Sequence, residues 1–312
     1  MKLSTLEILA FQQLPGVGTQ SVLKLLDLPL DRYVFEDLPA ICSEKKIKMN
    51  NTKGSGKIAI SIDALNAAKL KAERILSMSA NAGIGAISYF DAAYPNILRE
   101  TKDEKGKRTP PLLLFYRGDL SALKMPCVAV IGTRKPTPMA AKAAHYIAHV
   151  LAREDFCIVS GLALGCDAGG HEGALAANGR TIAFLGNGLD SVYPSENFGL
   201  AARIVKNGGL LLSEYPIGSK VTKYSLVARD RLQAGLSLAT VVIQTNISGG
   251  SMYAATATLK SGKMLYVVRY TDTAADSDPK NDGNRELLRL GGRPLAGETD
   301  FKLLKSEILM RP

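Results

Sequence analysis

The chain has 312 residues, of which 46% are hydrophobic and 22% charged, so it has the length and composition of a globular protein with a sizeable core. Its net charge of +10 suggests a polyanionic partner without establishing one. The 4 cysteines form no CxxC pair, which argues against zinc ribbons and redox motifs, and no apolar run approaches the length of a membrane span, so we expect a cytoplasmic protein without membrane contacts.

Residues 1–85 are expected to form a small helical domain. Apolar residues precede and follow the segment Leu14–Gly18 (Leu-Pro-Gly-Val-Gly), a pattern that predicts two helices joined by a tight turn. The glycine amides of such a turn lie at the start of the second helix, where they can face a phosphate. The segment resembles the helix-hairpin-helix element of DNA-binding proteins (SAM-like). A helical hairpin that serves only packing is the alternative, and both remain open.

Residues 86–312 are expected to form one large α/β domain. Predicted strands at Ala86–Tyr94 and Pro110–Gly118 lead into short apolar runs that alternate with longer helix-like segments. This alternation predicts an extended Rossmann-like, doubly wound parallel sheet covered on both faces. Further on, Tyr270–Gly283 is interpreted as a mobile acidic loop and Asn284–Gly292 as a closing helix. The predicted strands of the sheet are Val128–Ile131, Phe156–Val159, Thr181–Leu185, Leu210–Leu212, Val241–Ile243 and Met264–Val268.

The carboxyl ends of these strands carry small residues and backbone amides, and ligands of parallel α/β sheets bind at this edge. Gly132 lets the backbone turn closely, and Arg134 offers a fork for a phosphate, although a structural ion pair is the alternative role for this arginine. Ser248–Ser251 provides a second group of amides but lacks the Gly-Lys-Ser/Thr of a Walker loop. We predict a phosphate-binding rim built from Gly132, Thr133, Arg134, Lys135, Ser160, Gly161, Gly186, Ser248, Gly249, Gly250 and Ser251.

A basic cluster lies within Lys220–Arg231, where Asp230 is the only acid and Tyr224 is interleaved. This combination suits single-stranded nucleic acid, because bases stack on aromatic rings and phosphates pair with cations. The alternative is a solvated charged surface. If the segment is a loop that faces DNA, the charge of Asp230 weakens binding. The residues predicted to contact DNA here are Lys223, Tyr224, Arg229 and Arg231.

Candidates for catalysis are few. His145 and His149 are four residues apart, but Tyr146 stands where a zinc metalloprotease needs a glutamate. Glu214, at a strand end, is the single carboxylate well placed for acid–base chemistry. The lone Gly186-x-Gly188, without a ribose-binding acid, argues against a nicotinamide cofactor. We therefore predict no catalytic residue, no metal site and no cofactor.

Taken together, these motifs resemble the DNA-processing protein A (DprA/Smf) family over nearly the whole chain, most densely over residues 110–268. The order and spacing of so many segments argue against a chance resemblance. The matching segments are Val130–Pro136, Ile158–Ala163, Gly165–His171, Gly186–Asp190, Tyr193–Asn197, Ser213–Gly218, Arg229–Arg231, Ala234–Ser237 and Ser248–Ser251.

The resemblance implies an extended Rossmann fold that binds single-stranded DNA, forms a homodimer and loads DNA onto the RecA recombinase in recombination or natural transformation. It implies DNA contacts by Arg134 and Lys223. It also implies a backbone pocket for phosphate and base at Ser160–Gly161, Gly186 and Ser248–Ser251.

The chain departs from the family pattern in the basic cluster. Leu226, Val227 and Asp230 replace the usual Phe, Pro and Asn, so Tyr224 becomes the candidate for the stacking aromatic side chain. Many members also carry a C-terminal winged helix, and this chain ends too soon for one, as expected of a shortened member.

Two other functions remain open. The same superfamily includes LOG-type nucleotide phosphoribohydrolases, in which Glu214 and Arg134 would act on an N-glycosidic bond. Against this reading, Ser251 and Met252 follow Gly249-Gly250, and the glutamate of the LOG signature is missing. The third interpretation is a nucleotide-binding sensor that signals to another protein.

Overall fold

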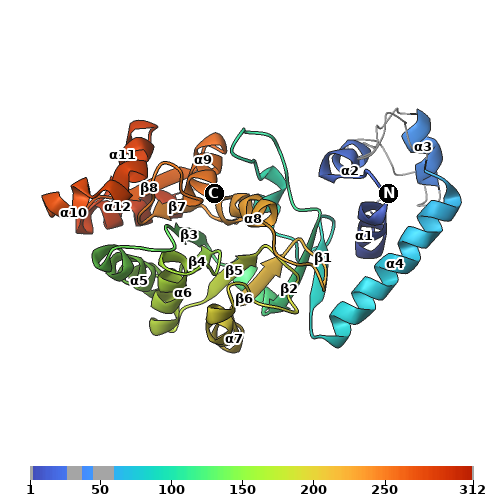
Figure 1. Ribbon diagram of the computed structural model, residues 1–312, viewed down its shortest axis with the longest axis horizontal. Coiled ribbons are helices and arrows are strands. Elements are labelled where there is room, and N and C mark those ends of the chain that lie inside the picture. Colours follow the sequence, from blue (N-terminus) through green and yellow to red (C-terminus); the bar gives the residue numbers. More distant parts are fainter. Residues whose placement is uncertain (1–2, 27–36, 45–59, 311–312) are drawn as a thin grey trace.

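A nine-stranded sheet runs through the computed structural model, which describes residues 3–26, 37–44 and 60–310 (Figure 1). From edge to edge, its strands are β1 (Gly85–Ser88), β2 (Leu113–Gly118), β6 (Leu210–Ser213), β5 (Thr181–Leu185), β4 (Cys157–Ser160), β3 (Cys127–Ile131), β7 (Ala239–Val242), β8 (Met264–Val268) and β9 (Arg293–Leu295). Neighbours from β6 to β9 are parallel, whereas β1 and β2 pair antiparallel at one edge. The predicted α/β sheet is therefore confirmed, with an antiparallel extension.

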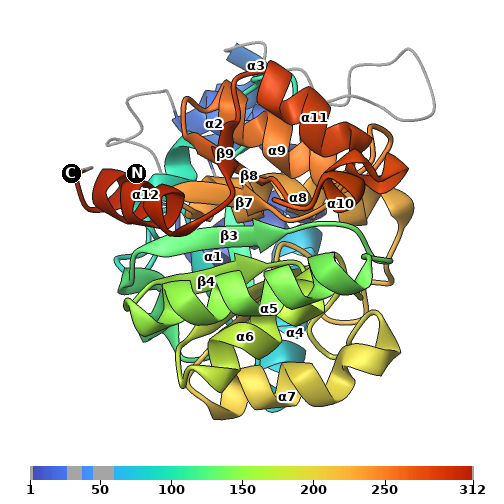
Figure 2. The same cartoon turned by 90° about the vertical axis from the view of Figure 1, so that its left-hand side faces the viewer.

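The central strands are buried on both faces, and successive residues point to opposite layers. In β3, Val128 and Val130 share a buried cluster with the first layer of helices, whereas Ala129 and Ile131 belong to the core of the second. The first layer consists of α5 (Pro138–Arg153), α6 (Cys166–Ala176), α7 (Phe198–Lys206) and α12 (Glu298–Leu309), and the second of α8 (Lys223–Leu236), α9 (Ser251–Lys260) and α11 (Asp282–Arg289) (Figures 1 and 2).

Helices before the sheet pack beside β1 and β2 (Figure 1). The turn Leu14–Gly18 joins the first two of them, as predicted. Leu9 and Phe11 belong to the same buried cluster as Leu113 and Phe115 of β2, so the helices and the sheet share a core. The division into residues 1–85 and 86–312 stays a prediction. These helices are α1 (Thr5–Gln13), α2 (Thr19–Leu26), α3 (Leu38–Glu44) and α4 (Ile62–Asn81).

The segment predicted as a mobile acidic loop is instead folded against the sheet. It forms α10 (Thr273–Ser277) and a short 3-10 helix, η6 (Pro279–Asn281). The buried amide of Asn284 donates to the carbonyl oxygens of Ile243 (3.0 Å) and Val268 (3.0 Å), which fixes the start of α11 on the ends of β7 and β8. Strand β9 and helix α12, which the sequence did not predict, follow.

Candidate nucleic-acid interface

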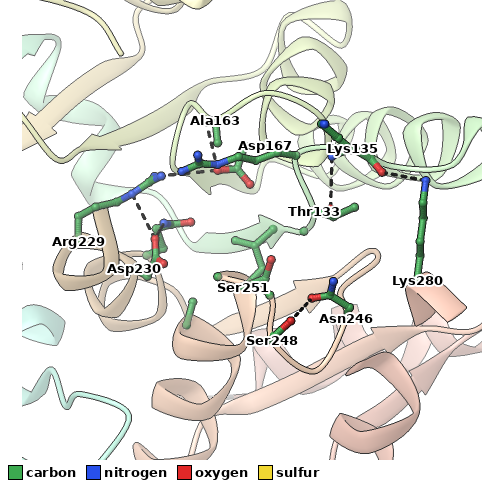
Figure 3. A pocket seen from close by; sticks show the side chains of 17 residues that line it. Thr133, Lys135, Ala163, Asp167, Arg229, Asp230, Asn246, Ser248, Ser251 and Lys280 are labelled. Carbon is green, nitrogen blue, oxygen red and sulfur yellow. Dashed lines mark hydrogen bonds and ion pairs between the residues drawn. The ribbon is translucent and has the colours of Figure 1, made fainter. Parts of the chain in front are cut away.

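The strand order places a topological switch between β3 and β7. The chain passes from β3 to β4 on one side and later returns to β7 on the other, so the loops after β3 and β7 diverge at the carboxyl edge. A cavity of about 580 Å³ lies there, and we call it the rim cavity (Figure 3). Its lining residues include Gly132, Thr133, Arg134, Lys135, Asp167, Arg229, Asp230, Gln233, Asn246, Ser248, Gly249, Gly250, Ser251 and Lys280.

One wall is the turn after β3, which is fixed by its backbone. The amide of Thr133 donates to the carbonyl oxygen of Gln244 (2.7 Å). The carbonyl oxygen of Thr133 accepts from the amide of Cys166 (3.1 Å). Only glycine fits at position 132, because an added Cβ would lie 2.6 Å from the sulfur of Cys166. The next two side chains, Arg134 and Lys135, are exposed cations. The close backbone packing therefore holds two positive charges over the cavity.

The opposite wall is the turn from Asn246 to Ser251. The amide of Gly249 donates to the carbonyl oxygen of Asn246 (2.9 Å), and α9 begins at Ser251 without a side-chain cap. The amides of Met252 and Tyr253 donate to the carbonyl oxygens of Gly249 (3.1 Å) and Gly250 (3.1 Å), so the anion-attracting amides at this helix start are those of Gly250 and Ser251. Lys280 of η6 adds a third cation, and its ammonium donates to the carbonyl oxygen of Lys135 (3.3 Å; Figure 3). The two walls together present backbone amides and cations to a bound anion.

The floor is a buried charge cluster in which Arg229 lies between two carboxylates (Figure 3). Its Nε lies 3.2 Å from Asp230, its Nη1 lies 4.0 Å from Asp167, and Nη1 also donates to the carbonyl oxygen of Phe184 (3.1 Å). Asp167 accepts from the amide of Gly161 (3.1 Å). Burial raises the pKa of Asp167, and it raises the pKa of Asp230 to about 7, although Arg229 opposes both shifts.

The cavity contains part of the predicted rim. Gly132 to Lys135 and Ser248 to Ser251 line it, together with Arg229. Ser160, Gly161 and Gly186 are buried and do not line the cavity, and their role in DNA binding stays a prediction. The hydroxyl of Ser160 donates to the carbonyl oxygen of Val130 (2.7 Å), and Arg229 fills the space at Gly161, where an added Cβ would lie 1.3 Å from Nη1. Their strands lie on one side of the switch: β4 pairs with β3, and β5 pairs with β4.

The predicted basic loop is also corrected, because residues 223–236 form helix α8. Lys223 and Tyr224, in its first turn, are exposed as expected of DNA contacts. Arg229 and Arg231 are two positions apart on the helix, so they point to different sides. Arg229 is buried in the floor cluster, and Arg231 pairs with Glu214 (2.7 Å), so neither is a free cation. A basic residue count could not distinguish these roles.

Lys280 and Asn246 also line the cavity, and neither was predicted as a site residue. Lys280 lies 145 residues after its partner Lys135, within a segment taken for a loop, so no local signal placed it at the site. Asn246 precedes the predicted glycine turn by two positions and extends the same wall.

A buried histidine and the strand-end glutamate have structural roles or lie apart from the cavity. His171 is buried with Nδ1 2.7 Å from the hydroxyl of Thr181, and burial lowers its pKa to about 3, so the ring is neutral. Glu214 lies on another cavity, beside Arg231. Over the described residues, no group of three or more His, Cys, Asp or Glu is placed to hold a metal ion. No helix in those parts of the chain has both the length and the apolar character of a membrane span.

Known proteins with related sequences and structures are consistent with this architecture. The family described as DNA recombination-mediator protein A matches residues 85–302. The chain is 41% identical to Protein Smf of Synechocystis over 169 residues, which are 53% of this chain and 41% of that protein. Less than half of this relative is therefore represented in the match.

Two solved structures share the fold. The X-ray structure of DNA processing protein A (DprA) from Streptococcus pneumoniae superposes with a TM-score of 0.75 at 26% identity, over 96% of this chain and 97% of that one. DNA processing protein A from Helicobacter pylori, described for its single-stranded DNA binding mode, superposes with a TM-score of 0.61 at 32% identity, over 72% of this chain and 96% of that one. Because the family model matches residues 85–302, well over half of the chain, the chain belongs to the DNA recombination-mediator protein A family, that of the DprA and Smf proteins.

Proposed function

We propose that this protein binds single-stranded DNA in the rim cavity, as a binding protein and not as an enzyme. The observation that carries the proposal is the exposed Arg134, held between two turns of small residues with Lys135 and Lys280 beside it. A phosphate there can take a bidentate contact from the guanidinium and further contacts from backbone amides. The single-stranded DNA binding mode described for the H. pylori relative supports the same chemistry.

The finer parts of the proposal are loading of the DNA onto RecA and action as a homodimer. Both follow from the family and from the need of a recombination mediator to pass a strand to a recombinase. They stay predictions, together with a cytoplasmic location.

Single strands are expected to bind roughly tenfold or more tightly than a duplex of matched length, because base stacking on exposed aromatic rings contributes about 1–3 kcal/mol per base and duplex bases are not available to stack. Fluorescence anisotropy with a labelled oligo-dT and its duplex, at one salt concentration, measures the difference. Equal or tighter binding of the duplex contradicts the proposal.

DNA affinity is expected to decrease as the pH rises from 6 to 8. Because burial raises the pKa of Asp230 to about 7, this carboxyl is mostly neutral at pH 6 and ionised at pH 8, when it repels a phosphate above the floor. The expected change in Kd is roughly two- to fivefold, given Coulomb interactions in a partly screened site. Asp230→Asn should remove this dependence. A variant that keeps the full pH dependence would show that another group titrates.

The hydrolase alternative needs Glu214 and Arg134 on one ligand. Arg134 lines the rim cavity, whereas Glu214 lines a different cavity and is paired with Arg231, so the arrangement does not favour this reading. A nucleotide sensor stays an alternative. Competition of mononucleotides with labelled oligo-dT, alongside an assay for released base, separates it from the proposed function.

A further inference from the structure

We infer that the bound single strand continues from the rim cavity across α8 and α9 into a second cavity, which we call the tyrosine cleft. This inference rests on the proposed function. The cleft has a volume of about 890 Å³. It is bounded by the turn region Gly16–Ser21 of the α1–α2 hairpin, by the loop Asp103–Lys107 and by the rings of Tyr215, Tyr224 and Tyr253.

The two cavities share a wall. Helix α8 lines the rim cavity with Asp230 and the cleft with Tyr224, and α9 lines the rim cavity with Ser251 and the cleft with Tyr253. A phosphate held at the start of α9 is therefore only two residues along the helix from an aromatic ring on the cleft side. A chain leaving the rim cavity in this direction meets the cleft next.

The rings suit stacked bases. Tyr224 is 80% exposed and Tyr253 is 40% exposed, although large aromatic side chains are usually covered. Tyr215 is half-buried, and burial raises the pKa of its hydroxyl to about 12, so the ring carries no charge at neutral pH. Aromatic faces bind any base without sequence preference, whereas they add little to a rigid duplex. The occupant that fits is an unpaired strand.

The charged side chains that line the cleft are three bases and three acids, so the cleft offers cations without a net positive charge. Lys105 and Lys107 are exposed, and neither ammonium forms an ion pair with a described residue. The carboxylate of Asp103 accepts from the amides of both lysines (3.0 and 2.8 Å), and Glu214 is paired with an arginine of α8. Glu104 is the remaining acid. The two lysines can therefore meet phosphates, and of the three acids only Glu214 has its charge balanced by a cation.

The hairpin is held in place across the cleft. The side-chain amide of Gln20 donates to the carbonyl oxygen of Arg108 (2.9 Å), which ties α2 to the end of the 103–107 loop. The predicted helix-hairpin-helix turn thus faces a cavity with aromatic and basic walls. This placement favours a DNA role for the hairpin over packing alone.

A length series of oligo-dT, from about 4 to about 16 nucleotides, tests the path. Tyr253→Ala should bind the shortest oligonucleotide like wild type, because that strand fills only the rim cavity, and should lose about fivefold or more in affinity for the longer ones. Tyr253→Phe, which keeps the ring, should bind every length like wild type. The matched control is Tyr146→Ala, because Tyr146 is 62% exposed on α5 and lines neither cavity.

A 2-aminopurine placed along the longer strand adds a direct readout of stacking. Its quenching at one end should be lost in Tyr253→Ala and kept in Tyr253→Phe. No loss at any length, or the same loss at every length, would overturn the inference. A different result would contradict the proposed function itself, namely an Arg134→Ala variant that binds even the shortest strand like wild type.

Discussion

Arg134→Ala is expected to weaken single-stranded DNA binding by one to two decades and leave the fold intact. The side chain is exposed at the carboxyl edge of β3, so its removal leaves no cavity in the core. A charge-assisted contact with phosphate contributes roughly 1.5–3 kcal/mol, which corresponds to about one to two decades in Kd. Losing one phosphate contact should also lower the salt slope of binding by about 0.7.

A salt titration of oligonucleotide binding for wild type, Arg134→Ala and Arg134→Lys measures both effects. The lysine variant should recover only part of the affinity, because it keeps the charge but not the guanidinium fork. Melting curves serve as the folding control. An Arg134→Ala protein that is folded and binds like wild type would contradict the assignment of the rim cavity as the DNA site and favour the nucleotide sensor.

Arg229→Ala is expected to destabilise the protein by about 3–5 kcal/mol, because it leaves two buried carboxyl groups without their cation. Arg229 is 4% exposed and lies between Asp167 and Asp230. The loss should be larger at pH 8 than at pH 5.5. At pH 5.5 Asp230, whose pKa burial raises to about 7, is largely neutral, whereas at pH 8 its ionisation costs energy in a floor that has lost its cation. Burial shifts the pKa of Asp167 in the same direction.

Urea unfolding at both pH values checks this prediction. In wild type, Asp230 keeps a proton that the unfolded chain releases between its ordinary pKa of 3.8 and about 7, so the contribution of this group to stability decreases as the pH rises through that window. The control is Arg203→Ala, which removes an exposed pair with Glu172 and should cost at most about 1 kcal/mol. A loss of that size in Arg229→Ala, or one independent of pH, would contradict the buried role.

The fold was largely predictable because buried strands of a parallel sheet are continuous apolar runs, and β3 to β8 all coincide with such runs to within a few residues. The structure of the end of the chain could not be predicted in this way. Strand β9 is only three residues long, with Arg293 and Pro294 exposed, so it has no apolar pattern to detect. The folded acidic segment depends on buried asparagine contacts made across the chain, and local composition gives no sign of them.

The site was predictable only in part, because strand ends can be read from the chain but strand order cannot. Gly132 and Ser248 follow the two strands at the switch and line the cavity, whereas Ser160 and Gly186, at the ends of β4 and β5 on one side of β3, are buried. Arg229 looked like a phosphate ligand because its type and its neighbours fit. Its burial follows from the helical geometry of α8 and from the space that Gly161 leaves for it.

Gln244 keeps the rim ordered in the free protein, which the charges of the rim do not do. Its carbonyl oxygen holds the amide of Thr133, its side-chain oxygen accepts from the amide of Thr137 (2.8 Å), and its side-chain amide donates to Asn281 (2.9 Å). One buried residue thus joins the β3 turn, the start of α5 and the segment that carries Lys280. Because these elements are already ordered before DNA arrives, the entropic cost of association falls mainly on the flexible strand.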